Sequence, residues 1–280
     1  WMYEFRKDST RAWVYLYSCL YKAKKEQNWK QALSAFQHIT HQASGKIRLM
    51  YADSMIDTAA KTADNSLLGA AYLSKGIVYY GQKQYQQAFD NYITDNNFIS
   101  KSGDRYLTIT VKYHMAQIKY HLGYYDEAVS LFRDCLEYFK KENPRIYLNA
   151  LHALGVCYNR TENYGLCAQT NKEGLSESRR LKIPEMHPYF IHSDGINNFF
   201  KHNYSTAVDK IKSSLKRIKD NSGFADESLG NFYIGKSYWA MGKKDTAVTY
   251  FLKADKTFTD RNYIRADQRE MYEMLIDYYD

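Results

Sequence analysis

Apolar residues recur along this chain with the spacing of a single helix face. Ile211, Leu215 and Ile218 form one such apolar stripe, and the lysines between them lie on the opposite side of the same helix. The segments 47–58 and 265–279 carry similar stripes. This spacing predicts amphipathic α-helices. With 14 Gly and 3 Pro in 280 residues, the chain also has too few turn residues for a loop-rich β fold. The sequence therefore predicts an all-α protein.

Small residues repeat along the chain with a period of about 40, and their steps are 40, 39, 40 and 40. A second small residue follows each of them twelve positions later. The first small residues are Gly76, Ala116, Gly155, Gly195 and Gly235, and the second are Ala88, Ala128, Cys167, Ala207 and Ala247. An earlier copy fits with Leu20 and Ala32. Small side chains at both places let two helices, A and B, approach closely, so the pattern indicates repeated helix hairpins.

Turn signals separate the two small residues of each unit, as in Gly81-Gln82-Lys83 and Met241-Gly242-Lys243. In five of six units an aromatic residue stands three positions before the second small residue, whereas the last unit has Lys244 there. This arrangement is that of tetratricopeptide repeats, whose usual length is ~34 residues, so each unit carries about six more. We therefore expect an all-α, right-handed superhelical solenoid of the tetratricopeptide type.

The repeat also predicts where helix pairs begin and end within a single solenoid covering 1–280. From Leu20 to Gly76 the step is 56, or 16 more than the period, which is enough for one extra helix. Adding one period to Gly235 predicts an unpaired terminal helix, which either caps the array or marks a fragment of a longer protein. The expected units are 12–44, an extra helix at 46–62, 69–101, 109–142, 148–182, 188–220, 228–260 and a terminal helix at 265–279.

Charge and motifs add little chemistry to this picture. The net charge of +8 comes from 39 basic and 31 acidic residues, and the densest basic run lacks the interleaved aromatics that single-stranded nucleic acid requires. A solvated outer face is therefore the expected explanation. The sequence has no phosphate-binding loop, nucleophile elbow or zinc-protease motif, and its four Cys show no CxxC pairing. We expect no catalytic residue, metal or cofactor, and hence a binding protein.

Stacked A helices leave an inner groove, and we expect it to be lined by residues three before and one, four and five after each first small residue. Polar groups cluster in the middle units and aromatic rings in the last two, which suits an extended peptide, a small molecule or a protein segment. The candidate ligand-binding residues are Tyr113, Gln117, Tyr120, His121, Asn149, His152, Asn159, Arg160, His192, Phe199, Lys236 and Trp239. The same residues could instead fill contacts between neighbouring helices, and the sequence leaves both interpretations open.

Several segments resemble one known family beyond the generic repeat positions. They are Ala71–Tyr80, Tyr147–Gly155, Asn231–Trp239, Tyr263–Arg265 and Leu275–Tyr279. The chain is similar over nearly its whole length to the N-terminal tetratricopeptide sensor region of membrane-bound bacterial transcriptional regulators. In that family a transmembrane helix and a cytoplasmic AraC-type helix-turn-helix domain follow. The resemblance implies a sensor domain at the periplasmic face of the inner membrane. It places DNA and membrane contacts in parts absent from this chain.

Two other classes of protein fit the same observations. One is a cytoplasmic peptide-pheromone receptor resembling the Rap proteins, which also use long repeats and Asn-rich grooves. The other is a protein–protein interaction scaffold with no signalling role. The chain is also a candidate for self-association as a homodimer. A stretch of about 20 apolar residues beyond Asp280 would favour the membrane regulator over both alternatives.

Overall fold

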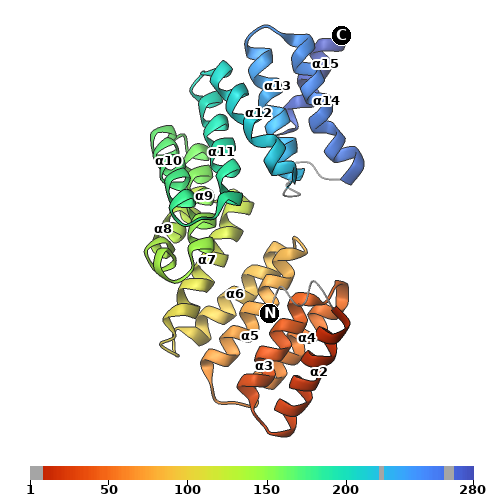
Figure 1. The fold of residues 1–280 in the computed structure, drawn as a ribbon, viewed down its shortest axis with the longest axis vertical. Coiled ribbons are helices and arrows are strands. Elements are labelled where there is room, and N and C mark those ends of the chain that lie inside the picture. The colour runs from red at the N-terminus through yellow and green to blue at the C-terminus, as the bar shows by residue number, and fades with distance from the viewer. Residues whose placement is uncertain (1–8, 221–223, 262–267) are drawn as a thin grey trace. The chain divides into compact units, whose positions relative to one another are not determined.

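The computed structural model describes residues 9–220, 224–261 and 268–280, and every regular element in these ranges is helical. The prediction of an all-α fold is thus confirmed. The chain divides into two compact units, Trp1–Glu127 and Ala128–Asp280. In unit 1 consecutive helices from α2 to α7 pack as neighbours, as Figure 1 shows for α2, α3 and α4, and in unit 2 so do those from α9 to α15.

Unit 1 contains six helices and the start of a seventh among its described residues. They are α2 (Ser9–Lys25), α3 (Trp29–Gln42), α4 (Gly45–Ala59), α5 (Asn65–Gly81), α6 (Tyr85–Ile99), α7 (Arg105–Leu122) and the beginning of α8 (Tyr125–Glu142). The extra helix expected at 46–62 falls on α4, which packs against α3 and α5. Two apolar cores hold this unit together, one shared by α2 to α5 and one by α5 to α7.

Unit 2 contains the rest of α8 and the remaining helices. These are α9 (Pro144–Arg160), α10 (Tyr164–Arg180), the 3₁₀ turn η1 (Pro184–Met186), α11 (His187–Phe200), α12 (Tyr204–Asp220), α13 (Phe224–Ala240), α14 (Lys244–Arg261) and α15 (Glu270–Tyr279). The terminal helix expected at 265–279 falls on α15, and residues 265–267 lie outside the described residues. Helix α9 starts sharply, because Asn143 accepts a hydrogen bond from the Ile146 N–H and Pro144 occupies the first turn.

The glycines among the first small residues lie where helix A and helix B of one repeat touch. A Cβ built on Gly76 would lie 2.3 Å from the ring of Tyr92, and one on Gly235 would lie 2.4 Å from Phe251. In both cases the contacted ring comes sixteen positions later, on helix B. The second small residues Ala88, Ala128, Cys167, Ala207 and Ala247 are all fully buried. The helix axes therefore approach as closely as the sequence pattern predicts.

Each turn from helix A to helix B contains one residue in the left-handed region of backbone space. These residues are Gln27, Lys83, Gly123, Glu162, His202 and Gly242. Their steps of 56, 40, 39, 40 and 40 repeat those of the first small residues, counted from Leu20. Only two of the six are glycine, although the conformation costs other residues roughly 1 kcal/mol. The packing of the two helices thus dictates the backbone conformation of the turn, whichever residue type stands at the left-handed position.

Replacing Glu162 with Gly should stabilise unit 2 by about 0.5–1 kcal/mol, because Glu162 holds a φ of 61° that glycine adopts without strain. The matched control is Lys172→Gly, on the exposed side of α10, which should destabilise by about 1 kcal/mol. Urea unfolding followed by circular dichroism measures both. A loss of stability in Glu162→Gly equal to that of the control would contradict the assignment of strain.

Candidate functional site

The predicted groove residues fall into the two units. Tyr113, Gln117, Tyr120 and His121 lie on α7 in unit 1. Unit 2 carries Asn149, His152, Asn159 and Arg160 on α9, His192 and Phe199 on α11, and Lys236 and Trp239 on α13.

The α7 set is bonded to itself and to the preceding hairpin. Gln117 donates a hydrogen bond from Nε2 to the hydroxyl of buried Tyr113 at 2.9 Å. His121 Nε2 and the Tyr80 hydroxyl share a hydrogen bond of 2.7 Å. The imidazole also stacks on Tyr85, with ring centroids 5.2 Å apart and planes 7° from parallel. These side chains join α5, α6 and α7 into one array.

Aromatic rings close the turn end of successive hairpins in the same way. The residue four places after the first small residue packs on the residue that begins helix B. Centroid distances are 5.9 Å for Tyr80–Tyr85, 6.2 Å for Tyr120–Tyr125 and 5.7 Å for Phe199–Tyr204. In the last helix-pair repeat Lys244 replaces the aromatic residue, and its Nζ lies 4.8 Å from the centroid of the Trp239 ring. Tyr120, Phe199 and Trp239 thus fill hairpin contacts.

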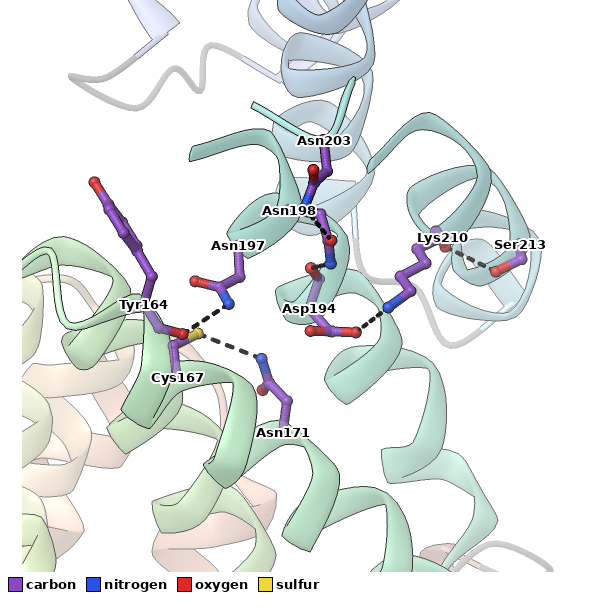
Figure 2. Close-up of polar contacts among 9 residues, drawn as sticks. All are labelled: Tyr164, Cys167, Asn171, Asp194, Asn197, Asn198, Asn203, Lys210 and Ser213. Carbon is purple, nitrogen blue, oxygen red and sulfur yellow. Dashed lines mark hydrogen bonds and ion pairs between the residues drawn. The ribbon is translucent and has the colours of Figure 1, made fainter. Parts of the chain in front are cut away.

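In the repeat formed by α9 and α10, Asn159 takes the equivalent position and makes a polar contact instead. Its side chain is buried and donates from Nδ2 to Asn197 Oδ1 at 3.2 Å. Asn197 in turn donates to the main-chain carbonyl of Tyr164 at 3.0 Å, as Figure 2 shows. Nearby, Asp194 on the same helix pairs with Lys210 on α12. The bonds of Asn159 and Asn197 join α9, α10 and α11, and the separate Asp194–Lys210 pair joins α11 to α12. The Asn159 amide thus lies inside a helix contact.

The remaining polar residues of the predicted set also contact neighbouring helices. Arg160 donates to the hydroxyl of Tyr233 on α13 at 3.2 Å. Lys236 pairs with Glu270 on α15 at 2.7 Å, and its Nζ also lies 5.3 Å from the Phe199 ring centroid. His192 is 3% exposed. Toward the ends of α9, α11 and α13 that lead into the turns, the predicted groove residues therefore contact one another and neighbouring helices.

A pocket of about 470 Å³ lies at the opposite end of these A helices. Its lining comes from α9, η1, α11 and α13, which are successive layers of unit 2. The lining residues are Arg145, Asn149, His152, Glu185, Met186, Tyr189 and Asp226. The volume is within the range typical of small-ligand sites. Two predicted residues, Asn149 and His152, are among them.

The electrostatics of the pocket are set by burial and by one ion pair. Burial lowers the pKa of His152 to about 4 despite the opposing influence of Asp226, so its imidazole is neutral at pH 7. The ring of His152 meets Tyr189 edge-on, with centroids 5.9 Å apart. The Arg145 guanidinium pairs with the Glu185 carboxylate. The backbone N–H of Glu185 and that guanidinium hold the pKa of Glu185 below its usual range, so it is ionised.

The lining residues that the sequence prediction missed lie one to two helical turns before the positions it considered. Tyr189 precedes Gly195 by six positions, as the predicted Asn149 precedes Gly155, and Arg145 and Glu185 precede the same two glycines by ten. Extending the repeat alignment toward the start of each A helix would have found them. Asp226, in the first turn of α13, also lines the pocket.

Another pocket, of about 580 Å³, lies between α2 and α3 in unit 1. It is confined to a single hairpin and contains none of the predicted groove residues. The pocket in unit 2 brings together three successive A helices, which is the surface that a solenoid offers to ligands. We therefore take the unit 2 pocket as the candidate site.

Comparison with known proteins defines the class of fold. Residues 109–142 and 231–257 match the family model of the tetratricopeptide repeat, and the first segment has the same bounds as a predicted unit. No curated protein sequence matches the chain significantly. Together with the helix hairpins, these matches show an all-helical solenoid of the tetratricopeptide type.

Solved structures share this fold at low sequence identity. NprR in complex with its cognate peptide NprX has a TM-score of 0.70 and 13% identity, covering 97% of this chain and 84% of NprR. A Rap protein complexed with Competence and Sporulation Factor has a TM-score of 0.62 and 16% identity, covering 90% of this chain and 77% of the Rap protein.

The Rap conjugation gene regulator of plasmid pLS20, in complex with the Phr* peptide, has a TM-score of 0.64 and 11% identity. The match covers 89% of this chain and 76% of the regulator. At such identities the likeness establishes the fold alone.

Across residues 9–220, 224–261 and 268–280, no helix is both long and apolar enough to cross a bilayer.

Proposed function

We propose that this chain is the ligand-binding part of a regulatory protein and that it takes a peptide, or a short protein segment, in the unit 2 pocket. The observation that carries the proposal is the pocket itself, which three successive A helices line. The exposed Asn149 amide can both donate to and accept from a peptide backbone. Tyr189 and Met186 offer apolar surface to side chains.

The similar solved structures support the class of ligand. NprR and the plasmid Rap regulator are each described in complex with a peptide, and a further Rap protein is described with Competence and Sporulation Factor. Those ligands belong to those proteins. A peptide ligand here agrees with the shared fold and with a pocket that offers both amide and apolar contacts.

Binding without catalysis is the activity that the pocket favours. The Glu185 carboxylate, a group that could act as a nucleophile, is instead paired with Arg145. Tyr189 and the neutral His152 pack edge-on against each other. We therefore infer a recognition site.

The family resemblance extends the proposal to the parent protein. We propose that this chain is the sensor region of an AraC-type transcriptional regulator, with DNA contacts made by a separate domain. The similarity of Ala71–Tyr80, Tyr147–Gly155 and Asn231–Trp239 to that family supports it. A Rap-like peptide receptor is the second candidate, and the TM-scores of 0.62 and 0.64 with two Rap proteins favour it. Both candidates share the peptide ligand.

The test is binding of fluorescent hexapeptide pools, measured by anisotropy. Wild type should bind at least one pool, and Asn149→Ala should weaken that binding about five-fold, the effect of one lost hydrogen bond. Gln169→Ala removes an exposed amide from α10 outside the pocket and should leave affinity unchanged. Equal affinity in wild type and Asn149→Ala would show that the peptide does not bind in this pocket. Failure of every pool to bind would count against a peptide ligand.

A further inference from the structure

Helix α2 exposes an apolar stripe that is bordered by cations. Val14 and Tyr21 lie on the same face, two turns apart, and are 62% and 72% exposed, and Tyr17 between them is exposed as well. Lys24 and Lys25 follow Tyr21 by three and four positions, so they lie next to it on the helix surface, and both are exposed. The 17 residues of α2 include no acid. This face is therefore both apolar and basic.

The apolar surface continues onto α4. The hydroxyls of Tyr17 and Tyr51 share a hydrogen bond of 2.8 Å, which places α2 beside α4. Ile47 and Met50 on α4 are both more than half exposed. The two basic and two acidic residues of α4 cancel. The charge of the combined α2–α4 surface therefore comes from α2.

Helix α15 presents the opposite charge beside exposed hydrophobic side chains. Its inner side belongs to the core of unit 2, where Met271 is buried and Met274 and Leu275 pack against the same cluster. The exposed residues of the helix and its C-cap are Glu270, Glu273, Ile276, Asp277, Tyr279 and Asp280. Four of these are acids, two are large hydrophobic residues, and the helix contains no base. The outer side of α15 is therefore both apolar and acidic.

Helix dipoles explain only part of this pattern. The lysines of α2 and the first acids of α15 lie at the helix ends that favour their charge. Asp277 and Asp280 lie at the other end of α15, where the dipole disfavours an acid and no base stands in the last turn. The flanking residues Asp8, Glu26 and Arg269 reduce the two charge excesses without reversing either. A basic, apolar partner would offset the charge of α15 and cover its exposed side chains.

We infer that this chain supplies that partner itself: α2 of one copy packs against α15 of another, so that copies associate head to tail. The two surfaces are opposite in charge and alike in their exposed apolar side chains. The interface is heterologous, so a pair of copies still exposes one α2 and one α15 to further copies. It includes no residue that lines the unit 2 pocket, and the inference is independent of the peptide ligand.

The size of the contact sets its strength. Helix α15 has 10 residues and is about 15 Å long, and one face of a helix is about 10 Å wide. The contact therefore buries on the order of a few hundred Å² per copy, less than the roughly 800 Å² of a stable interface. The association is weak, so it grows with protein concentration. It falls as salt is added, because the paired charges lie at the surface.

Sedimentation equilibrium of the full chain, from low micromolar to sub-millimolar concentration, tests the inference through paired charge reversals. The average mass of wild type should rise with concentration. Lys24→Glu with Lys25→Glu should weaken association about tenfold, and Glu273→Lys with Asp277→Lys should do the same. An equal mixture of the two variants should restore association, because the acidic α2 of one meets the basic α15 of the other.

The matched control is Lys141→Glu with Lys216→Glu, which makes the same change in net charge at exposed positions on α8 and α12 and should leave association unchanged. Circular dichroism checks that each variant is folded. A wild type that stays monomeric at every concentration overturns the inference, also if an acidic peptide then binds α2. Association that survives either reversal, or folded variants whose mixture stays monomeric, overturns it too. None of these outcomes bears on peptide binding in the unit 2 pocket.

Discussion

Replacing Asp95 with serine will stabilise unit 1 at pH 7 by on the order of 3 kcal/mol, because the folded unit no longer has to hold a buried carboxyl group in its protonated form. Asp95 is fully buried on α6, and neither carboxylate oxygen has a hydrogen-bond partner. Its Oδ1 is so close to the backbone of Gly69 on α5 that a Cβ built there would lie 2.8 Å away. Burying an acid without partners is unfavourable, whichever protonation state it adopts.

The other repeats show what this position accommodates. In the four later repeats the residues equivalent to Asp95 are Cys135, Gly174, Ser214 and Ala254, all small, and in the first repeat the equivalent residue is Ile39. Ser214 is buried without penalty, because its hydroxyl donates to the Ile211 carbonyl one turn earlier at 2.8 Å. A serine at position 95 can make the same bond to the carbonyl of Tyr92. Asp95 is the one acidic residue at this position among the six repeats of the sequence.

The pH dependence of the stability of unit 1 follows from the direction in which burial shifts the pKa of Asp95. Burial raises the pKa of Asp95 from 3.8 to about 8, so the folded unit keeps a proton that the unfolded chain releases. The free energy of unfolding is therefore highest below pH 4, as far as this group is concerned. It falls as the pH rises from about 4 to about 8 and is level above that.

Urea unfolding at pH 5 and pH 8, with hydrogen exchange to locate the change in α5 and α6, measures this contribution. Asp95→Ser and Asp95→Asn, which keeps the shape of the side chain, should both lose the fall in stability that Asp95 causes between these values. They should keep the rise with pH that comes from buried His114, whose pKa is lowered to about 4. A stability difference between wild type and Asp95→Ser that does not widen from pH 5 to pH 8, or a serine variant less stable than wild type at pH 8, would contradict the prediction.

Gly174→Ala should destabilise unit 2 by about 2 kcal/mol, even though alanine is the better helix former. A Cβ at position 174 on α10 would lie 2.1 Å from the ring of Phe190 on α11. Phe190 is fully buried and its ring is also met edge-on by His152, at 5.7 Å between centroids. The ring cannot withdraw, so the two helices must separate.

Gly165→Ala is the matched control on the same helix, because a Cβ there meets nothing within 4 Å. It should stabilise by about 0.5–1 kcal/mol through helix propensity alone. Thermal unfolding of both variants separates packing from propensity. Phe190→Leu should partly restore the Gly174→Ala protein by making room for the new methyl group. Two alanine variants of equal stability would show that α10 and α11 are not in close contact at Gly174.

The fold could be predicted because close helix packing requires small residues at regularly spaced positions, and this spacing is visible in a single sequence. Gly76 and Gly235 recur at the repeat period since a larger side chain would collide with Tyr92 or Phe251. The aromatic residue that begins helix B was also visible, and its replacement by Lys244 preserves the contact through Trp239. Such constraints act between residues twelve or sixteen positions apart, which is within one hairpin.

The site was harder to predict because it depends on contacts between hairpins. Asn159 and His152 lie two turns apart on α9, yet one is bonded inside a helix contact and the other lines the pocket. Nothing in their residue types distinguishes these environments. The structure shows the pocket at the starts of the A helices, where Arg145 and Glu185 pair across elements 40 residues apart. The expected periplasmic location rested on the family resemblance and on no residue of the candidate site.

The central claim, that a peptide binds at the starts of the unit 2 A helices, is tested most directly by hydrogen exchange with and without the tightest-binding hexapeptide pool. The account predicts slower exchange in residues 145–152, 185–192 and 226–232, which carry the pocket. Exchange should be unchanged at the turn end of α11, around Phe199. Protection centred on Phe199 and Trp239, or confined to unit 1, would contradict it.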